Sequence, residues 1–157
     1  MKLAEALILR ADAQKRIQQL RERLARSARI QEGDTAPENP EELLVEVSRT
    51  VVEFNDLIKK INRTNAQTTF DETRTLTDAL AARDALALEH NVLTGLLAEA
   101  TGQNAQMRYG YAQATNIKYF RTVDVASVQK RADDLAQQRR DLDARIQALN
   151  WNADLIE

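Results

Sequence analysis

The sequence has no cysteine, four glycines, two prolines and only 4% aromatic residues among its 157 positions. The absence of cysteine excludes disulfides, thiol catalysis and thiolate metal sites, and it agrees with a reducing compartment. No apolar run approaches the ~20 residues that are needed to cross a bilayer, and charged residues interrupt the first apolar stretch directly after Leu9. We therefore expect an unexported, cytoplasmic protein that does not enter membranes.

The remaining composition favours long helices. Ala, Leu, Glu, Arg, Gln and Asp dominate the sequence, which is typical of helices and not of a β-sandwich or barrel. Apolar residues recur every three or four positions in four stretches, and the length suffices for one domain with its own core. We predict a mainly α protein, a single-domain antiparallel four-helix bundle over residues 1–157. The predicted helices lie at about 2–31, 40–65, 76–101 and 124–150.

Opposite charges predict that the first two helices pair. Residues 1–31 carry eight Lys/Arg against three Asp/Glu, whereas residues 32–57 carry one against eight. Such charge matching determines which helices pair and in which register. It adds little to the stability of the fold, because exposed ion pairs contribute ~0–1 kcal/mol each. The basic first helix could also bind nucleic acid, but its basic residues alternate with acids and the chain has a net charge of -2. We therefore disfavour a nucleic-acid partner.

Apolar rows indicate which faces of these two helices meet. In the first helix Arg10 continues the row of Leu3 and Ile17, where an arginine needs a carboxylate partner or extends its stem to the rim. In the second helix the spacing alternates between three and four residues, the pattern of a left-handed packed helix pair. We therefore expect an antiparallel hairpin whose second helix packs through Leu44, Val47, Val51, Phe54, Ile58, Ile61 and Asn65.

Residues 103–123 hold all three tyrosines and the densest aromatic cluster. Met107, Tyr109 and Tyr111 alternate with polar residues, and the alternation resumes after an Ala-Thr-Asn bend, which is typical of two short strands. We therefore predict a short β-hairpin at about 105–122, inserted between helices three and four. An isolated hairpin is marginally stable in water, so its apolar side must lie against something.

Three apolar surpluses predict that the protein forms homo-oligomers. Leu7, Ile8 and Leu9 together are broader than one helical seam, the predicted hairpin is aromatic, and Trp151 lies in a segment that would fray unless it docked. An oligomer contact also explains the hairpin more economically than RNA binding, because the aromatic and glycine signature of an RNA-binding sheet is missing. The expected contact residues are Leu7, Ile8, Leu9, Tyr109, Tyr111, Tyr119, Phe120 and Trp151.

The densest polar chemistry lies between residues 62 and 90. Arginines in this region could fork around a carboxylate or a phosphate, or they could satisfy loop carbonyls and one another, and we favour the structural role. The only histidine, His90, lies on an apolar helical face, and without a second His or Cys it cannot build a familiar zinc site. The candidate polar cluster comprises Asn62, Arg63, Asn65, Arg74, Asp78, Arg83, Asp84, His90, Arg108 and Lys118.

A weaker enzymatic alternative is Mg²⁺-dependent nucleotide pyrophosphohydrolysis. All-helical enzymes of this class hold Mg²⁺ with Glu-Glu-x-x-Glu on one helix and a further Glu and Asp on the next. Here Glu42 and Glu46 would be the second and third acids of the first motif, but one residue too many separates them, which rotates Glu46 by ~100° about the helix axis. Glu53 and Asp56 would supply the further Glu and Asp. We therefore predict no metal ion and no cofactor, and no catalytic residue can be assigned.

Several segments resemble a known family: MKLAEALILRADAQKRIQQLRERL, INRTNAQT, RTLTDALAARD, VDVASVQKRADDL and ARIQALNWNADLIE. Together they resemble a family of small uncharacterised bacterial proteins, some of whose members carry the label septicolysin. The resemblance implies a helical fold, homo-oligomers with a hexamer as one candidate assembly, and no established activity. The label suggests a cytolysin, but the sequence has no membrane-length apolar stretch and no long amphipathic segment of low charge.

Continuous apolar rows without a convergent catalytic set favour a cytoplasmic, self-associating structural or interaction protein over an enzyme. The main alternative is a small-molecule or phosphate-binding protein, or an enzyme, that uses the Arg/Asp cluster around residues 62–90. The expected partner is the protein itself, with no membrane and no nucleic acid.

Overall fold

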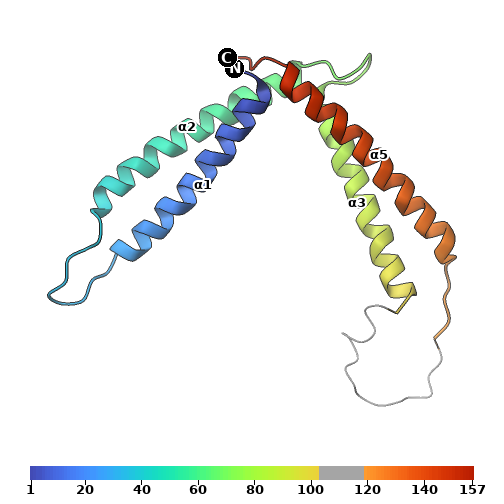
Figure 1. Cartoon of the computed structure of the whole chain (residues 1–157), viewed down its shortest axis with the longest axis horizontal. Coiled ribbons are helices and arrows are strands. Elements are labelled where there is room, and N and C mark those ends of the chain that lie inside the picture. Colours follow the sequence, from blue (N-terminus) through green and yellow to red (C-terminus); the bar gives the residue numbers. More distant parts are fainter. Residues whose placement is uncertain (103–118) are drawn as a thin grey trace. The chain divides into compact units, whose positions relative to one another are not determined.

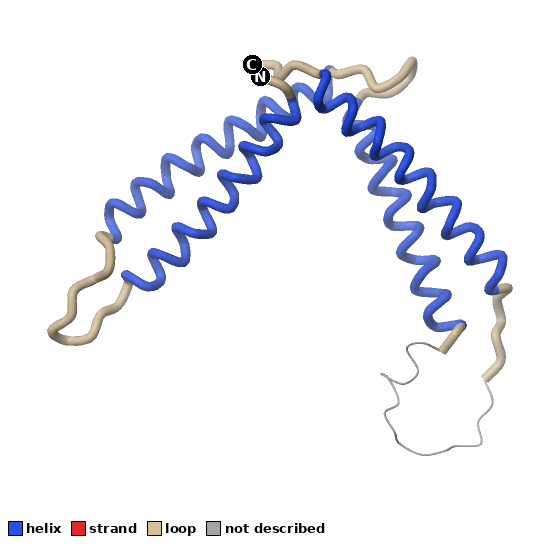
Figure 2. The backbone as a smooth tube through the Cα atoms, in the orientation of Figure 1, coloured by secondary structure: helices blue, strands red, loops and turns tan. Residues whose placement is uncertain are grey.

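The computed structural model describes residues 1–102 and 119–157, and this part of the chain contains four helices (Figure 1). They are α1 (Leu3–Ser27), α2 (Pro40–Gln67), α3 (Leu76–Ala100) and α5 (Val125–Asn152). Figure 2 shows helices joined by loops, and the described ranges contain no strand, only isolated bridges. None of these helices is long and apolar enough to cross a membrane. The prediction of a mainly helical protein is confirmed.

Two local predictions differ from the structure. Helix α1 ends at Ser27 and not near residue 31, because residues 28–31 are all exposed and have no packed face to extend the helix. The β-hairpin predicted at about 105–122 falls mostly on residues 103–118, which lie outside the described part of the chain. Residues 119–122 are described and form no strand, so the hairpin is not supported.

The chain divides into two compact units, each of which contains a pair of helices. Unit 1 comprises Met1–Leu76 and Gln147–Glu157 and holds the pair of α1 and α2. Unit 2 comprises Thr77–Ile146 and holds α3 and most of α5. A two-helix pair covers only one face of each helix, so each unit retains uncovered surface. The closed four-helix bundle and the single domain stay predictions.

The row of α2 that is buried overlaps the predicted row at Ile61 and is otherwise shifted to one side of it. Leu3 and Leu20 of α1 are fully buried. On α2, however, Leu44 and Val51 are 53% and 44% exposed, so α1 covers the predicted row only in part. The apolar face of α2 is wider than one partner helix, and α1 covers one edge of it. The buried residues of α2 are Leu43, Thr50, Ile61 and Thr64.

Helices α3 and α5 pair around a small apolar core in unit 2. Leu93 and Leu97 of α3 are buried together with Ala132 and Leu135 of α5. At the rim of this contact, Arg131 of α5 forms an ion pair with Glu89 of α3. The contacts fix the face of α3 that turns toward α5. Three half-buried residues extend the core: Leu86, Val125 and Val128.

The beginning and the end of the sequence meet in unit 1. The backbone N–H of Leu3 donates to the carbonyl of Ala153 at 2.9 Å, and the N–H of Leu155 donates to the carbonyl of Met1 at the same distance. These two bonds satisfy backbone groups that would otherwise fray into water. We refer to these four residues, together with Ile156, as the terminal clasp.

A buried hydroxyl of α2 anchors the terminal clasp. Thr64 is fully buried, and its Oγ1 accepts a hydrogen bond of 2.9 Å from the N–H of Ile156. The same hydroxyl donates to the carbonyl of Lys60 at 2.8 Å. Outside this contact, Lys2 and Asp154 form an ion pair of 2.8 Å. One threonine thus connects α2 to the segment that follows α5.

Candidate functional site

Arg83, a central member of the predicted polar cluster, is held by two aspartates within unit 2. Its Nη2 donates to Oδ1 of Asp84 at 2.8 Å, and its Nη1 lies 3.6 Å from Oδ1 of Asp143 on α5. The arginine side chain is 30% exposed. The guanidinium therefore bridges α3 and α5, and two carboxylates already occupy the positions in which an anionic ligand would bind.

Arg63 is engaged with the end of the sequence in unit 1. Its Nη1 donates to a backbone oxygen of Glu157, and Lys60 forms an ion pair with the side chain of the same residue. The hydrogen bond from Lys60 holds the pKa of the Glu157 carboxyl below its usual value. Both cations thus secure the segment beyond the terminal clasp.

Arg74 belongs to a tight turn between α2 and α3. Its Nη2 donates to Oδ2 of Asp71 at 2.6 Å, and its guanidinium lies 5.3 Å from the ring centre of Phe70. The other carboxylate oxygen of Asp71 accepts the N–H of Thr73 and that of Arg74, at 3.2 and 3.0 Å. Chiefly the bond from the Arg74 side chain, and then these backbone donors, lower the pKa of Asp71 from 3.8 to about 2.

The turn predicts a dependence of stability on acid. Because the pKa of Asp71 is lower in the folded protein, its ionised carboxylate stabilises the fold above pH 3.8, and this contribution disappears as the pH falls toward about 2. Replacing Asp71 with asparagine should therefore lower the free energy of unfolding at neutral pH and cost progressively less below pH 4. Urea unfolding of both proteins across this range measures the difference. A pH-independent difference would contradict the assignment.

The structure divides the predicted cluster among separate partners. Arg63 bonds to Glu157, Arg74 to Asp71, and Arg83 to Asp84 and Asp143. Asn62 is exposed, Asn65 is half-buried, and Asp78 is exposed and has an interaction partner. Arg108 and Lys118 lie outside the described residues.

His90 lines a small hollow between α3 and α5. The hollow has a volume of about 250 Å³, and Thr94, Val125 and Gln129 lie around it. This volume is below the ~300–1,000 Å³ that is usual for small-molecule sites. The hydroxyl of Thr94 donates back to the carbonyl of His90 at 3.1 Å, and the imidazole makes no hydrogen bond with a described residue. The described ranges contain no group of three ligands that could hold a metal ion.

Three of the four acids of the pyrophosphohydrolase alternative have other partners. Glu46 forms an ion pair with Arg16, and the hydrogen bond from Arg16 is the main reason that the pKa of the Glu46 carboxyl is lowered. Asp56 lies 3.6 Å from Lys59. Glu42 accepts a hydrogen bond of 3.3 Å from the side chain of Asn39. Cations and a helix cap thus engage three of the four carboxylates that the alternative would give to Mg²⁺, and the fourth, Glu53, is exposed.

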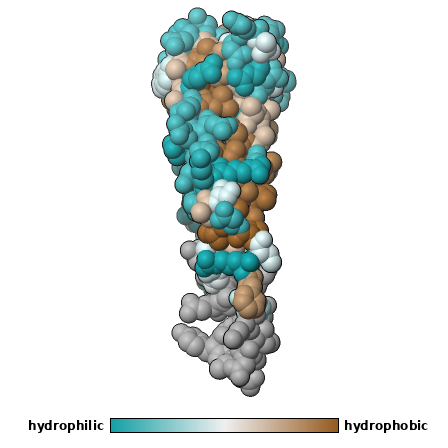
Figure 3. All heavy atoms as spheres, turned by 90° about the vertical axis from the view of Figure 1, so that its right-hand side faces the viewer, coloured by the Kyte–Doolittle hydropathy of each residue, from teal (hydrophilic) through white to brown (hydrophobic). Residues whose placement is uncertain are grey.

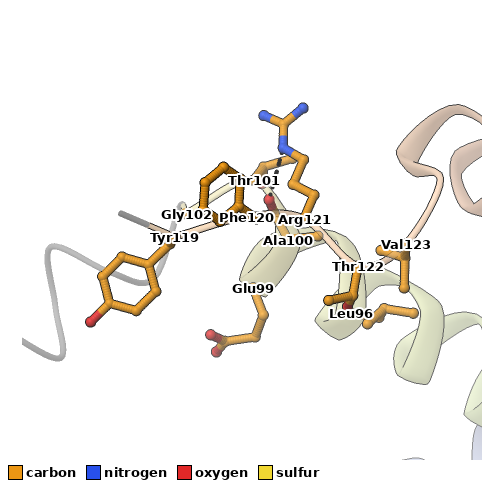
Figure 4. A pocket seen from close by; sticks show the side chains of 10 residues that line it. All are labelled: Leu96, Glu99, Ala100, Thr101, Gly102, Tyr119, Phe120, Arg121, Thr122 and Val123. Carbon is orange, nitrogen blue, oxygen red and sulfur yellow. Dashed lines mark hydrogen bonds between the residues drawn. The ribbon is translucent and has the colours of Figure 1, made fainter. Parts of the chain in front are cut away.

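A further hollow, of about 600 Å³, lies where α3 ends and the chain returns toward α5 (Figure 4). The Nε of Arg121 donates to the carbonyl of Ala100 at 3.1 Å, as the dashed line in Figure 4 shows. Tyr119 and Phe120 line this hollow and are 80% and 83% exposed. It contains no pair of catalytic groups, and it borders residues 103–118, so we assign no chemistry to it.

The apolar surfaces are more conspicuous than any polar site. Of the predicted oligomer contacts, Leu7 is half-buried, and Ile8, Leu9 and Trp151 are about half exposed. Tyr119 and Phe120 are largely exposed. Tyr109 and Tyr111 lie outside the described residues. Figure 3 shows apolar side chains along the length of the face in view, beside a band of hydrophilic ones. A further apolar surface, which was not predicted from the sequence, lies on the side of α3 that does not contact α5. It carries Ala81, Ala85, Leu88, Val92, Gly95 and Leu96.

These observations define a class: a helical protein of paired helices, without an assembled catalytic or metal-binding set in the described part of the chain. The chain belongs to a family of unknown function, DUF6847, whose model matches residues 10–155. It is similar to the crystal structure of a functionally unknown conserved protein from Corynebacterium diphtheriae. The two share 40% sequence identity with a TM-score of 0.91, over 99% of each chain. No curated protein matches the chain, and neither description carries the label septicolysin.

Proposed function

We propose that the chain is a self-associating structural or interaction protein that works in the cytoplasm as a homo-oligomer. The observation that carries the proposal is the outward face of α3, defined as Ala81, Ala85, Leu88, Val92, Gly95 and Leu96. Leu88 and Val92 are each 69% exposed, and Leu96 is 38% exposed. Single exposed leucines are common on protein surfaces, but a continuous apolar row along a helix marks an interaction surface.

Helix α3 is apolar on two opposite sides. Leu93 and Leu97 are buried against α5, while Leu88, Val92 and Leu96 recur at four-residue spacing on the other side. The outward face has no charged residue between Ala81 and Leu96. A surface helix normally keeps the side opposite its buried face polar, so an apolar row on that side indicates a second covered face. Covering this face by a second copy removes its apolar area from water.

The arginines do not favour the anion-binding alternative. Arg63, Arg74 and Arg83 each donate to a carboxylate or to a backbone oxygen of this chain. An anionic ligand would first have to displace these partners, and the exchange of one paired anion for another yields little affinity. The proposal therefore assigns the polar residues to the structure of the monomer and the apolar faces to assembly.

Light scattering coupled to gel filtration tests the proposal. We expect the wild-type protein to have a mass in solution that is a multiple of its chain mass of 17.7 kDa, and a hexamer is one candidate assembly. The double variant Leu88→Lys, Val92→Lys should elute as a monomer, because burying two ammonium groups without partners is costly. Both side chains are exposed, so the variant should keep its helical circular dichroism spectrum.

A matched control separates apolar contact from charge. The double variant Gln137→Lys, Gln138→Lys adds the same two positive charges at exposed positions of α5. It should assemble like the wild type. A monomeric wild-type protein at micromolar concentration would refute the proposal, as would a lysine variant of α3 that assembles normally.

A further inference from the structure

The two sides of the α1–α2 pair differ in character. On one side Arg16 and Arg23 of α1 form ion pairs with Glu46 and Glu38 of the acidic part of the chain. Helical spacing places an apolar channel on the opposite side of the pair. We define this α1–α2 groove by four residues of α1 and four of α2: Leu7, Arg10, Ile17, Leu24, Val47, Val51, Phe54 and Ile58.

The groove is only partly covered within unit 1. Its members are half-buried, apart from Val51, which is 44% exposed. They border the contact of α1 with α2 without being enclosed by it. An apolar channel between two helices is the usual receptor for the apolar face of a third helix, which contacts both walls at once.

Arg10 identifies the kind of helix that fits. It is half-buried in the groove, and it forms no hydrogen bond or ion pair with the described residues. A guanidinium that becomes covered without a partner is strongly destabilising. A helix that fills the groove should therefore bring a carboxylate. Helix α1 has six Lys/Arg and three Asp/Glu, so its whole surface favours an acidic partner.

Helix α3 matches these requirements. Residues 76–100 contain four Asp/Glu against one arginine, so α3 is as acidic as α1 is basic. Asp84, which pairs with Arg83 but remains 67% exposed, stands at one end of the uncharged outward face. That face spans 16 positions from Ala81 to Leu96 and the groove 18 positions from Leu7 to Leu24, lengths of about 24 and 27 Å at ~1.5 Å per residue.

We propose that the outward face of α3 in one copy docks into the α1–α2 groove of a second copy. This inference rests on the proposed self-association and names the two surfaces that meet. The contact is heterologous, because one copy contributes its α3 face and the other its α1–α2 groove. The first copy's groove and the second copy's α3 face stay free for further copies. Such contacts build closed rings when the rotation between copies closes, and a ring of six is one such assembly.

Disulfide trapping between separately labelled chains tests the inference, and the absence of native cysteine leaves no background. One chain carries Val51→Cys in the groove, and a second, affinity-tagged chain carries Val92→Cys on α3. Both positions are partly or largely exposed, so both variants should fold. After mixing, exchange of subunits and mild oxidation, we expect a covalent species of twice the 17.7 kDa chain mass that contains both chains. In the control, the second chain carries Gln138→Cys instead of Val92→Cys, and we expect little of this cross-linked species.

Each other outcome overturns the inference in a recognisable way. Cross-links of Val92→Cys chains with themselves would show a face-to-face contact between two α3 helices. A chain with both cysteines that closes a disulfide within itself would show that its own α3 fills its own groove. No cross-link in a sample that light scattering shows to be oligomeric refutes this contact and leaves self-association intact, whereas a monomeric sample refutes the proposed function itself.

Discussion

Replacing Leu20 with alanine should lower the free energy of unfolding by about 2–5 kcal/mol. Leu20 lies on the α1 face that packs on α2 and is fully buried. The alanine loses the transfer free energy of the removed carbons and leaves a cavity that two long helices cannot collapse around without shifting along their length. Urea unfolding followed by far-UV circular dichroism measures the loss.

An exposed aliphatic residue provides the control for this prediction. Ile30 lies outside the helices and is 54% exposed, so Ile30→Ala removes a similar apolar group from a site that contributes little to packing. We expect a change within about 0.5 kcal/mol. If the two substitutions had equal effects, Leu20 would not be a core residue and the packing of the α1–α2 pair would need revision.

Replacing Thr64 with valine should destabilise the protein by about 1–3 kcal/mol. Valine has nearly the shape of threonine, so the effect isolates the hydroxyl. The N–H of Ile156 loses the oxygen that accepts its hydrogen bond and becomes a partly buried donor without that partner. Hydrogen exchange adds a local measurement, because the Ile156 amide should lose its protection while amides in the middle of α2 keep theirs.

Thr50 is the matched control on the same helix. It is also buried, but its hydroxyl only donates to the carbonyl of Glu46, at 2.8 Å. It accepts no hydrogen bond from the residues that the structure describes. That carbonyl lies within α2, where it keeps its helical backbone partner. Thr50→Val should therefore cost much less than Thr64→Val. Equal costs would mean that the terminal clasp does not depend on the Thr64 hydroxyl.

Local chemistry explains why the helices could be predicted. The start of α2 shows this clearly: Asn39 Oδ1 accepts the N–H of Glu41 at 3.0 Å, and Pro40 occupies the first helical position. Capping, proline geometry and three- and four-residue apolar spacing act over a few residues, so they are visible in the sequence. The limit of α1 was less predictable because the end of a helix depends on what it packs against.

The polar residues illustrate why a site cannot be derived from composition. Arg63, Arg74 and Arg83 lie within about twenty positions in the sequence, and the sequence alone left open whether they form one anion site or a structural network. Their partners, however, are Glu157, Asp71 and the pair of Asp84 and Asp143. Two of these acids are distant in sequence, and no local pattern indicates them. Only the packing of helices against each other brings such groups within hydrogen-bonding distance.

The sequence alone determined that the chain is helical, where its helices lie to within a few residues, and that it lacks cysteine chemistry, because these properties follow from composition and short-range spacing. The tertiary structure decided which edge of an apolar face is covered. Helix α2 presents two overlapping rows that share Ile61, and the residues that become buried are Leu43, Thr50, Ile61 and Thr64. The choice among such rows depends on the partner helix and its register, which involve contacts between residues far apart in sequence.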